Sequence, residues 1–464
     1  MELRRGTGCP VNGWLREYWT PERKRTAWLV LCATAVCSFA AHGFLFSNEF
    51  FSHDSISYFT YATGSFSFYT SIGRFVIPVY ELLKGDVAAP WLIGILFILW
   101  MSMSAWLVIH LFRIRTTGGI LLTCGLLCTN LALTLTGATY VYCMDEYAFA
   151  LFLAVAAVWC CHRGSWWMLL GLGLLVGSLA VYQAYFTVAA SLCLLLVMVR
   201  LRNNEALSRA VLAGVRYLAL LAVGFVAYYG VWTLVCSAAG VAKRRVEESL
   251  LAGGLGKLLG LVRDANVDYV KGLFDSCGVL GWWMPVVHGL LLAMLSWYLL
   301  RMLTDKQLHI GNKVLLMVLV CLLPTAFNSA AILLAGSATQ LMTFANELLY
   351  LLLLLCREWE ERQATPLRTV AAILLCCVLW QHVVYANQVY LKKELDKTVG
   401  LWSDYSATYN LGRYLTDYLN YPLVWDTETD FSQLPEVQAM PAFPDAGGIR
   451  MVDGTVVVKL SCGT

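Results

Sequence analysis

The sequence has little charge for its length. Of its 464 residues, 14% are charged and 59% are hydrophobic, whereas soluble domains carry about 25% charged residues. Most of the chain is therefore suited to lipid rather than to water. The formal net charge of +3 is too small to indicate a nucleic-acid partner, so the placement of the charges is more informative than their sum.

Signatures of nucleotide-driven and metal-dependent enzymes are also missing. The chain contains no P-loop, Rossmann glycine pattern, GxSxG or HExxH. Its 16 cysteines form no CxxC pair and no His/Cys cluster at metal-ligand spacing, so we interpret them as small hydrophobic residues. Cys236 and Cys277 flank one loop and could pair in an oxidising compartment. We expect no metal and no cofactor. If the protein transfers a chemical group, the absence of a nucleotide-binding motif favours an activated donor that is itself a membrane lipid.

Long apolar segments fill the middle of the chain, and about 20 apolar residues are enough to cross a bilayer. We therefore expect an all-α polytopic membrane protein with about eleven spans, namely 26–46, 89–112, 117–136, 145–162, 166–182, 184–200, 211–236, 279–301, 313–333, 338–356 and 369–386. The first segment could be a signal peptide, but its length favours an uncleaved span. We find no internal repeat of the kind that transporters commonly carry.

Lysine and arginine alternate between the loops that join these spans. With the N-terminus in the cytoplasm, the cytoplasmic loops carry the basic residues, which are Arg113, Arg115, Arg163, Arg200, Arg202, Arg209, Arg301, Lys306, Lys313, Arg357, Arg362 and Arg368. The short loops on the opposite side, 137–144, around Gln183 and 334–340, carry none. The alternation supports an odd number of spans.

On this topology, two long loops and the end of the chain lie outside the cytosol. The outer loops are 47–88 and 237–278. The C-terminal module, 387–464, begins with a helical pattern and ends in an alternating, strand-like GTVVVKLSC, so we expect a small mixed α/β unit. The predicted organisation is a cytoplasmic segment 1–25, a transmembrane domain 26–386 and this module.

The first outer loop holds the candidate catalytic residues. Glu49, His53 and Asp54 would lie within about one and a half turns of a helix. A carboxylate here could take a proton from an acceptor hydroxyl as that oxygen attacks the anomeric carbon of a sugar, and His53 could orient the acceptor or hold the leaving phosphate. Asp54 is also suited to cap a helix that begins at Ser55. The two roles are compatible.

Cations of the outer loops are candidates for binding a donor phosphate, since lysine and arginine are its usual protein partners. Arg74 stands in a short amphipathic segment, where it could bind phosphate or simply extend to the interface. The second loop carries the cations Lys243, Arg244, Arg245, Lys257 and Arg263, which break the positive-inside rule. Apolar residues recur there at helical spacing, which predicts a basic helix in the membrane interface or one packed over the bundle.

A third set of polar residues lies at the same ends of later spans. The candidates for contacts with sugar or acceptor are Asp145, Glu146, Tyr182, Gln183, Tyr185, Asn346 and Glu347. Each has an alternative structural role. The first two acids suit the dipole of the helix that they begin, tyrosine is common at membrane interfaces, and the last two side chains could hydrogen-bond between helices.

Five segments resemble a known family: FFSHDSISYF, GRFVIPVYELL, DEYAFALFLAVAAVW, SLAVYQAYFTVAASLCLLL and VVYANQVYLKKELD. They are similar to segments of the polytopic glucosyltransferases that decorate O-antigen, the serotype-converting glucosyl transferase family, which has the GT-C membrane fold. The segments touch most of the chain, although each is short and degenerate. The resemblance implies a multi-pass protein of the bacterial inner (cytoplasmic) membrane.

The resemblance also implies an activity. Members of the fold take sugar from a polyprenyl-phosphate donor, generally without metal, and use an acid of the first outer loop. We therefore expect glucose or a related hexose to pass to a cell-surface glycan in one inverting displacement. Asp54 would be the base, and the donor phosphate would meet Arg74 or the cations of 243–263. The expected partners are this lipid donor, the glycan acceptor and the bilayer.

One position departs from the family. Paired aspartates often begin this loop, and here the first of the two positions is His53. If both acids are needed, Glu49 becomes the alternative base, or Asp145 shares the work. Two further functions remain as alternatives: a transporter or flippase of lipid-linked sugars, and a scaffold without chemistry. The clustering of ionisable residues at one face, rather than along a path, favours the enzyme.

Overall fold

The computed structural model describes residues 20–48, 65–85, 89–244, 254–333, 339–359, 366–395, 429–442 and 445–459. The predicted site residues Glu49, His53, Asp54 and Arg245 lie outside these ranges. The described residues divide into two units, a helical bundle that ends at Tyr390 and a C-terminal unit that begins at Leu391.

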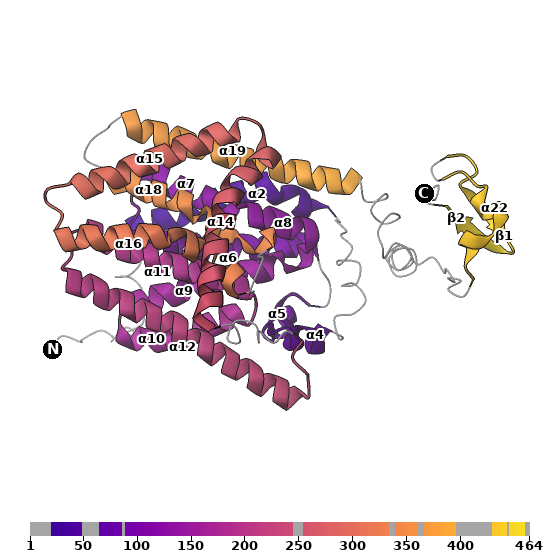
Figure 1. The fold of residues 1–464 in the computed structure, drawn as a ribbon, viewed down its shortest axis with the longest axis horizontal. Helices are drawn as coiled ribbons and strands as arrows, with labels where there is room; N and C mark the ends of the chain where they lie inside the picture. The colour runs from indigo at the N-terminus through magenta and orange to yellow at the C-terminus, as the bar shows by residue number, and fades with distance from the viewer. Residues whose placement is uncertain are drawn as a thin grey trace, which may run out of the picture. The chain divides into compact units, whose positions relative to one another are not determined.

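Nine helices of the described part are long and apolar enough to cross a membrane, which confirms a mostly helical, multi-pass architecture (Figure 1). They are α2 (Pro21–Ser47), α6 (Pro90–Phe112), α7 (Thr117–Cys128) with α8 (Leu131–Thr139), the 3₁₀ turn η2 (Val141–Cys143) with α9 (Met144–Arg163), η3 (Gln183–Tyr185) with α11 (Phe186–Arg202), α12 (Leu207–Ala239), α15 (Met284–Thr304), α16 (Ile310–Phe327) and α19 (Pro366–Leu395).

The remaining helices of the bundle are shorter or less apolar. They are α4 (Ser65–Ser71), α5 (Ile77–Lys84), α10 (Ser165–Leu179), α14 (Gly254–Leu280), α17 (Ser329–Leu333), α18 (Leu348–Trp359) and the 3₁₀ turns η4 (Gln340–Met342) and η5 (Phe344–Glu347). The predicted spans 166–182 and 338–356 correspond to α10 and α18, which have 15 and 12 residues. At 1.5 Å per residue these helices are about 22 and 18 Å long, less than the 30 Å of a bilayer core. The predicted number of eleven spans is therefore not confirmed.

Local chemistry explains where several helices begin. The side chains of Thr20, Thr116 and Asn130 each accept a hydrogen bond from a backbone N–H in the first turn of α2, α7 and α8, as favoured N-cap residues do. Pro21 and Pro90 occupy the first turn of α2 and α6, where proline removes no helical hydrogen bond.

Helix α9 lies at the centre of the bundle and packs against α6, α10 and α11. Its alanines at 148, 150, 154 and 157 are fully buried, and small residues let neighbouring helices approach closely. The approach is tightest at Gly171 of α10, where a Cβ atom would lie 2.9 Å from the carbonyl oxygen of Ala157. This packing fixes the two ends of α9, which carry the polar clusters described below.

Helix α14 is the basic amphipathic helix that the second outer loop predicts. It packs on α15, α16 and α17 and crosses the neighbouring long helices at a steep angle (Figure 1). Val267, Val270 and Phe274 are exposed among charged residues, as expected of a helix in a membrane interface. Tyr269, by contrast, is buried, and its hydroxyl donates to the carbonyl oxygen of Asn346 at 3.3 Å.

The C-terminal unit contains η7 (Phe431–Gln433), α22 (Pro435–Gln438) and an antiparallel hairpin of β1 (Ile449–Val452) and β2 (Thr455–Val458). Asp453 and Gly454 have φ of 48° and 82°, as a type I′ turn requires. Val437, Met440 and Val452 form a small core. The predicted mixed α/β module thus has two strands in its described part.

Candidate functional site

The end of α4 and the turn that joins it to α5, residues 70–76, form the centre of one polar end of the bundle; we call this segment the Arg74 turn. Helix α12 holds this turn through two side chains. Trp232 Nε1 donates to the carbonyl oxygen of Thr70 at 2.7 Å, and the Tyr228 hydroxyl donates to that of Gly73 at 3.1 Å. Both bonds are made to backbone carbonyls of the turn, so the Arg74 side chain takes no part in them.

The η3 turn fixes the other side of the Arg74 turn. Gln183 Nε2 donates to the carbonyl oxygen of Ile72 at 2.8 Å and to the hydroxyl of Tyr228 at 2.9 Å. The backbone N–H of Val76 donates to the carbonyl oxygen of Ala180 at 3.1 Å. Gln183, a predicted sugar or acceptor contact, therefore also has a structural role beside Arg74.

Arg74 projects onto two stacked tyrosines. Its Nη1 donates to the hydroxyl of Tyr147 at 2.8 Å, and its guanidinium lies 5.1 Å from the ring centre of Tyr182. The two rings are stacked at 4.0 Å. A guanidinium carries five N–H donors, and in the described part of the chain Arg74 makes this one side-chain hydrogen bond and no ion pair. A positive charge with donors to spare suits a phosphate.

Of two cations of the second outer loop, Arg244 is bound to this turn through its backbone, and Lys243 lies against α12, where its ammonium donates to Thr233 Oγ1 at 2.6 Å. The backbone N–H of Arg244 donates to the carbonyl oxygen of Ser71 at 3.0 Å, and its guanidinium lies 5.5 Å from the ring of Phe68. The Lys243 ammonium lies 4.1 Å from the ring centre of Tyr229 and 4.7 Å from that of Trp232. The predicted phosphate-binding cations Arg74, Lys243 and Arg244 thus lie around one turn.

The other predicted cations of this loop lie on α14. The guanidinium of Arg263 is exposed and forms an ion pair with its neighbour Asp264 at 2.8 Å. Such exposed pairs contribute about 0–1 kcal/mol. Lys257 is exposed as well. Their part in phosphate binding stays a prediction.

The acids that begin α9 are buried and paired with a lysine. Lys84 Nζ lies 3.3 Å from Asp145 Oδ1 and 2.5 Å from Glu146 Oε1, and it also donates to the carbonyl oxygen of Tyr142 at 2.6 Å. All three charged side chains are at most 1% exposed. Burial alone would lower the pKa of Lys84, but the carboxylates of Glu146 and Asp145 outweigh it and raise that pKa above its ordinary value.

The remaining predicted sugar contacts form a second aromatic and polar group. Tyr182 and Tyr185 pack edge to face at 5.4 Å, and Tyr185 packs against Phe344 at 5.6 Å. The backbone N–H of Leu131 donates to Glu347 Oε1 at 2.8 Å, and this bond joins η5 to α8. The predicted interhelical role of Glu347 is therefore observed.

Residues that the sequence did not single out complete this end of the bundle. Lys84 is the partner of the acidic pair, while Tyr147 and Tyr228 bind Arg74 and its turn. A signal for Lys84 was present, because buried acids in an apolar run require a cation and loop 47–88 offers only Arg74 and Lys84. The tyrosines gave no such signal.

Gly73 provides a direct test of how the turn is held. It has φ of +83°, and a Cβ atom here would lie 2.1 Å from the Tyr228 hydroxyl oxygen and 2.9 Å from Gln183 Nε2. We expect Gly73→Ala to displace both side chains and to lower the thermal stability of the purified protein, because strain and clash add. Thermal unfolding in detergent would measure this.

Gly85 is the matched control for that substitution. Its φ is +75°, yet a Cβ atom there would meet no atom within 4 Å. Gly85→Ala therefore carries the backbone strain, about 1 kcal/mol, without the clash. Equal losses of thermal stability in Gly73→Ala and Gly85→Ala would contradict the described fit of Tyr228 against the turn. Adding Tyr228→Phe, which removes the clashing hydroxyl, should restore part of the stability that Gly73→Ala loses.

Of three comparisons with known proteins, one identifies a family. No curated protein and no solved structure matches the chain. The family description "Glucosyl transferase GtrII" matches residues 43–356, which include the Arg74 turn, the acidic pair of α9, η3 and η5. The match covers more than half of the sequence, in agreement with the resemblance noted above. The chain therefore belongs to the GtrII glucosyl transferase family, and it is a membrane glycosyltransferase.

Proposed function

We propose that the protein transfers glucose, or a related hexose, from a polyprenyl-phosphate donor to a glycan acceptor at the extracytoplasmic face of a bacterial inner membrane. On this proposal the N-terminus is cytoplasmic, and the Arg74 turn and the C-terminal unit face the other side. The observation that supports it most is the placement of Arg74, Lys243 and Arg244 around one turn, since a departing lipid phosphate requires such cations.

The proposed reaction is a single displacement. Asp54 takes the proton of the acceptor hydroxyl as that oxygen attacks the anomeric carbon, and the bond from this carbon to the phosphate oxygen breaks. The leaving polyprenyl phosphate gains negative charge in the transition state, and fixed cations stabilise such charge strongly in a site with little water. His53 orients the acceptor or assists at the phosphate.

The surroundings of Asp145 argue against it as the catalytic base. Asp145 is fully buried and paired with Lys84, which is the arrangement of a carboxylate that supports structure. We therefore assign the proton transfer to Asp54, with Glu49 as the second candidate. Asp145 and Glu146 would then act on the sugar indirectly, by fixing Lys84 and the start of α9 beside Tyr147.

The polar groups nearest to the Arg74 turn are proposed to bind sugar and acceptor. Tyr182 stacks on Tyr147 and faces Arg74, and aromatic faces with nearby amides are suited to sugar rings and their hydroxyls. Gln183 has its amide nitrogen occupied, so its carbonyl oxygen is the atom offered to a hydroxyl. Asn346 Oδ1 is buried and accepts no hydrogen bond from the described residues, which makes it a further acceptor for a sugar hydroxyl.

Arg74 tests the phosphate assignment. We expect Arg74→Gln to lower kcat/KM for the lipid donor about 10- to 100-fold, because a charge-assisted hydrogen bond contributes roughly 1.5–3 kcal/mol. Arg74→Lys should lower kcat/KM less than Arg74→Gln does, since lysine retains the positive charge but lacks the planar guanidinium that binds two phosphate oxygens at once. Steady-state transfer from polyprenyl-phosphate glucose, at varied donor concentration, would measure both.

Two controls separate binding from structure. Tyr147→Phe removes the hydrogen bond to Arg74 but keeps the ring stack and the charge, so its effect should be small. Arg209→Gln removes an exposed arginine of α12 at the opposite end of the bundle and should leave transfer unchanged. If Arg74→Gln keeps the wild-type kcat/KM for the donor, Arg74 does not bind its phosphate.

A further inference from the structure

A second polar region lies at the far end of the same helices. The acids that begin α9 lie beside the Arg74 turn, whereas His162, near the end of α9, lines a cavity of about 1180 Å³. Asp145 and His162 are 17 positions apart in α9, which corresponds to about 26 Å of helix. The cavity is therefore separate from the proposed transfer site, and it is large compared with the 300–1,000 Å³ of ordinary ligand pockets.

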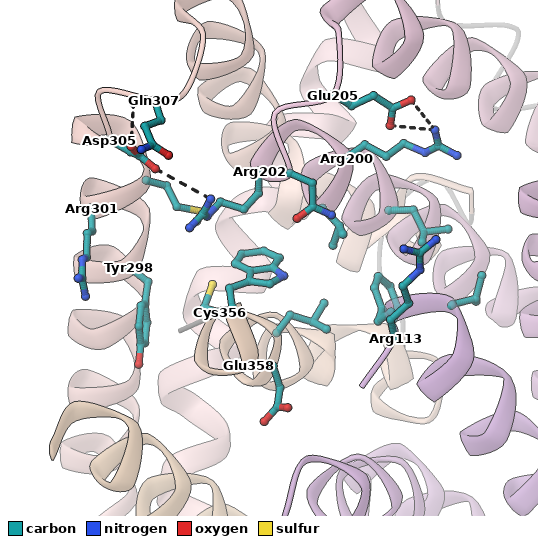
Figure 2. Close-up of a pocket in the computed structure, with 18 of the residues that line it drawn as sticks. Arg113, Arg200, Arg202, Glu205, Tyr298, Arg301, Asp305, Gln307, Cys356 and Glu358 are labelled. Atoms are coloured by element: carbon teal, nitrogen blue, oxygen red, sulfur yellow. Dashed lines mark hydrogen bonds and ion pairs between the residues drawn. The ribbon is translucent and has the colours of Figure 1, made fainter. Parts of the chain in front are cut away.

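The cavity is formed where several helices end. Figure 2 shows Arg113 and Arg200 on one side of it and Arg301 and Asp305 on the other. Leucines and other apolar side chains from the helices supply the rest of the lining; among them are Leu111, Leu196, Val199, Met302 and Leu355. The cavity thus combines cations with apolar walls.

Arginine exceeds carboxylate in this lining. Five arginines and three carboxylates line the cavity, namely Arg113, Arg115, Arg200, Arg202, Arg301, Glu205, Asp305 and Glu358. Each carboxylate already has a basic neighbour: Glu205 pairs with Arg200 at 3.1 Å and Asp305 with Arg202 at 4.0 Å. Glu358 pairs at 2.5 Å with Arg357, which does not line the cavity. The carboxylates therefore do not neutralise the cavity.

Helix dipoles explain some of these arginines but not all. Arg200, Arg202 and Arg301 lie in the last turns of α11 and α15, where a cation interacts favourably with the dipole. Arg115 lies directly before Thr116, the N-cap of α7, where a cation is unfavourable. Neither Arg113 nor Arg115 forms an ion pair with any described residue, and both are exposed. An anion other than these carboxylates, bound in the cavity, would be a partner for Arg113 and Arg115.

The backbone at Arg113 supports the same conclusion. Arg113 ends α6 in the left-handed region, with φ of 54°, a conformation that costs a non-glycine residue roughly 1 kcal/mol. Glycine or asparagine would end the helix at lower cost. Capping therefore does not explain an arginine here; its charge suits both the cytoplasmic loop predicted above and a negatively charged ligand in the cavity.

We propose that this cavity binds phosphate, carried either by the headgroup of an anionic phospholipid or by a soluble phosphate ester, and that Arg113 and Arg115 bind it. Guanidinium groups match phosphate oxygens in pairs, and basic pockets between membrane helices are suited to anionic headgroups. The apolar part of the lining offers contacts to the glycerol and upper acyl chains of a lipid. This inference does not depend on the donor proposed above.

The test compares two double variants of the full-length protein that lose the same charge. Arg113→Asn with Arg115→Gln removes the two proposed ligands, and asparagine tolerates the left-handed conformation at 113. Arg209→Gln with Lys306→Gln removes two exposed charges that do not line the cavity. Native mass spectrometry in a neutral detergent would measure binding of added phosphatidylglycerol, with phosphatidylcholine as the zwitterionic comparison. Thermal unfolding would measure the effect of sodium phosphate.

We expect the cavity variant to bind phosphatidylglycerol about tenfold more weakly than the wild type, and the control variant to bind it equally well. If sodium phosphate raises the melting temperature of the wild type and not of the cavity variant, and phosphatidylglycerol does not bind, the ligand of the cavity is a soluble phosphate ester rather than a lipid headgroup. Equal binding of both probes by the wild type and the cavity variant overturns the proposal, as does an equal loss in both double variants. Should the cavity variant fail to fold, Arg115→Gln alone is expected to weaken binding about threefold, and an unchanged affinity would overturn the proposal.

Discussion

Asp54→Asn is expected to lower the rate of glucosyl transfer at least 100-fold while leaving the protein folded. An amide cannot accept the proton of the attacking hydroxyl, and general base catalysis contributes typically 10²–10⁴-fold. The measurement is the transfer of labelled glucose from polyprenyl-phosphate glucose to a glycan acceptor in purified membranes, with the amount of folded protein determined in the same samples.

This substitution also separates catalysis from capping. Asparagine is as good an N-cap as aspartate, so Asp54→Asn keeps any helix start at Ser55. Asp54→Ala removes both functions and should in addition lower stability, by about 1 kcal/mol. Unchanged transfer in Asp54→Asn would remove the base assignment. If transfer fell instead in Glu49→Gln, the base would be Glu49.

The second large effect is expected in stability, at Lys84. Lys84→Met leaves the carboxylates of Asp145 and Glu146 buried without their cation, and breaking a buried pair from one side costs about 3–5 kcal/mol. Because the pKa of Lys84 is raised in the folded protein, its contribution is fully present at neutral pH and is lost as the pH rises past the ordinary lysine range. We expect little folded protein to survive heating of this variant in detergent.

A matched set of variants tests whether the charge is the cause. Lys84→Met combined with Asp145→Asn and Glu146→Gln removes all three charges and should recover much of the stability, since a neutral buried cluster avoids the unpaired charges. Lys271→Met removes an exposed lysine of α14 and should change stability by less than about 0.5 kcal/mol. A Lys84→Met protein as stable as Lys271→Met would contradict the buried ion pairs.

Hydropathy predicted the mostly helical, multi-pass architecture; the orientation that charge placement predicts stays a prediction. Apolar length located α2, α6, α12 and α15 because a span has to be continuously apolar, whatever it contacts. The same criterion predicted longer helices at α10 and α18 than the structure has; α18 is buried among its neighbours, whereas Trp166 and Leu169 of α10 are exposed. Apolar length alone does not distinguish a buried helix from a spanning one.

The sequence likewise predicted only some of the residues around the Arg74 turn. The sequence identified Arg74 as a cation of a short amphipathic segment, and the structure places Lys243 and Arg244 beside its turn. Its tyrosine partners, Tyr147 and Tyr182, were not predicted as such, because they are distant in sequence and tyrosine is common near membrane interfaces. Only the packing of α9 against α10 and η3 brings them to the guanidinium.

The identity of the donor tests the central claim most directly. Purified protein in liposomes would receive labelled glucose either as polyprenyl-phosphate glucose or as a nucleotide-activated glucose, with a glycan acceptor present. We predict that label reaches the acceptor from the lipid donor alone. Transfer from the nucleotide sugar without any lipid carrier, or movement of the lipid donor across the bilayer without transfer, would contradict the proposed reaction.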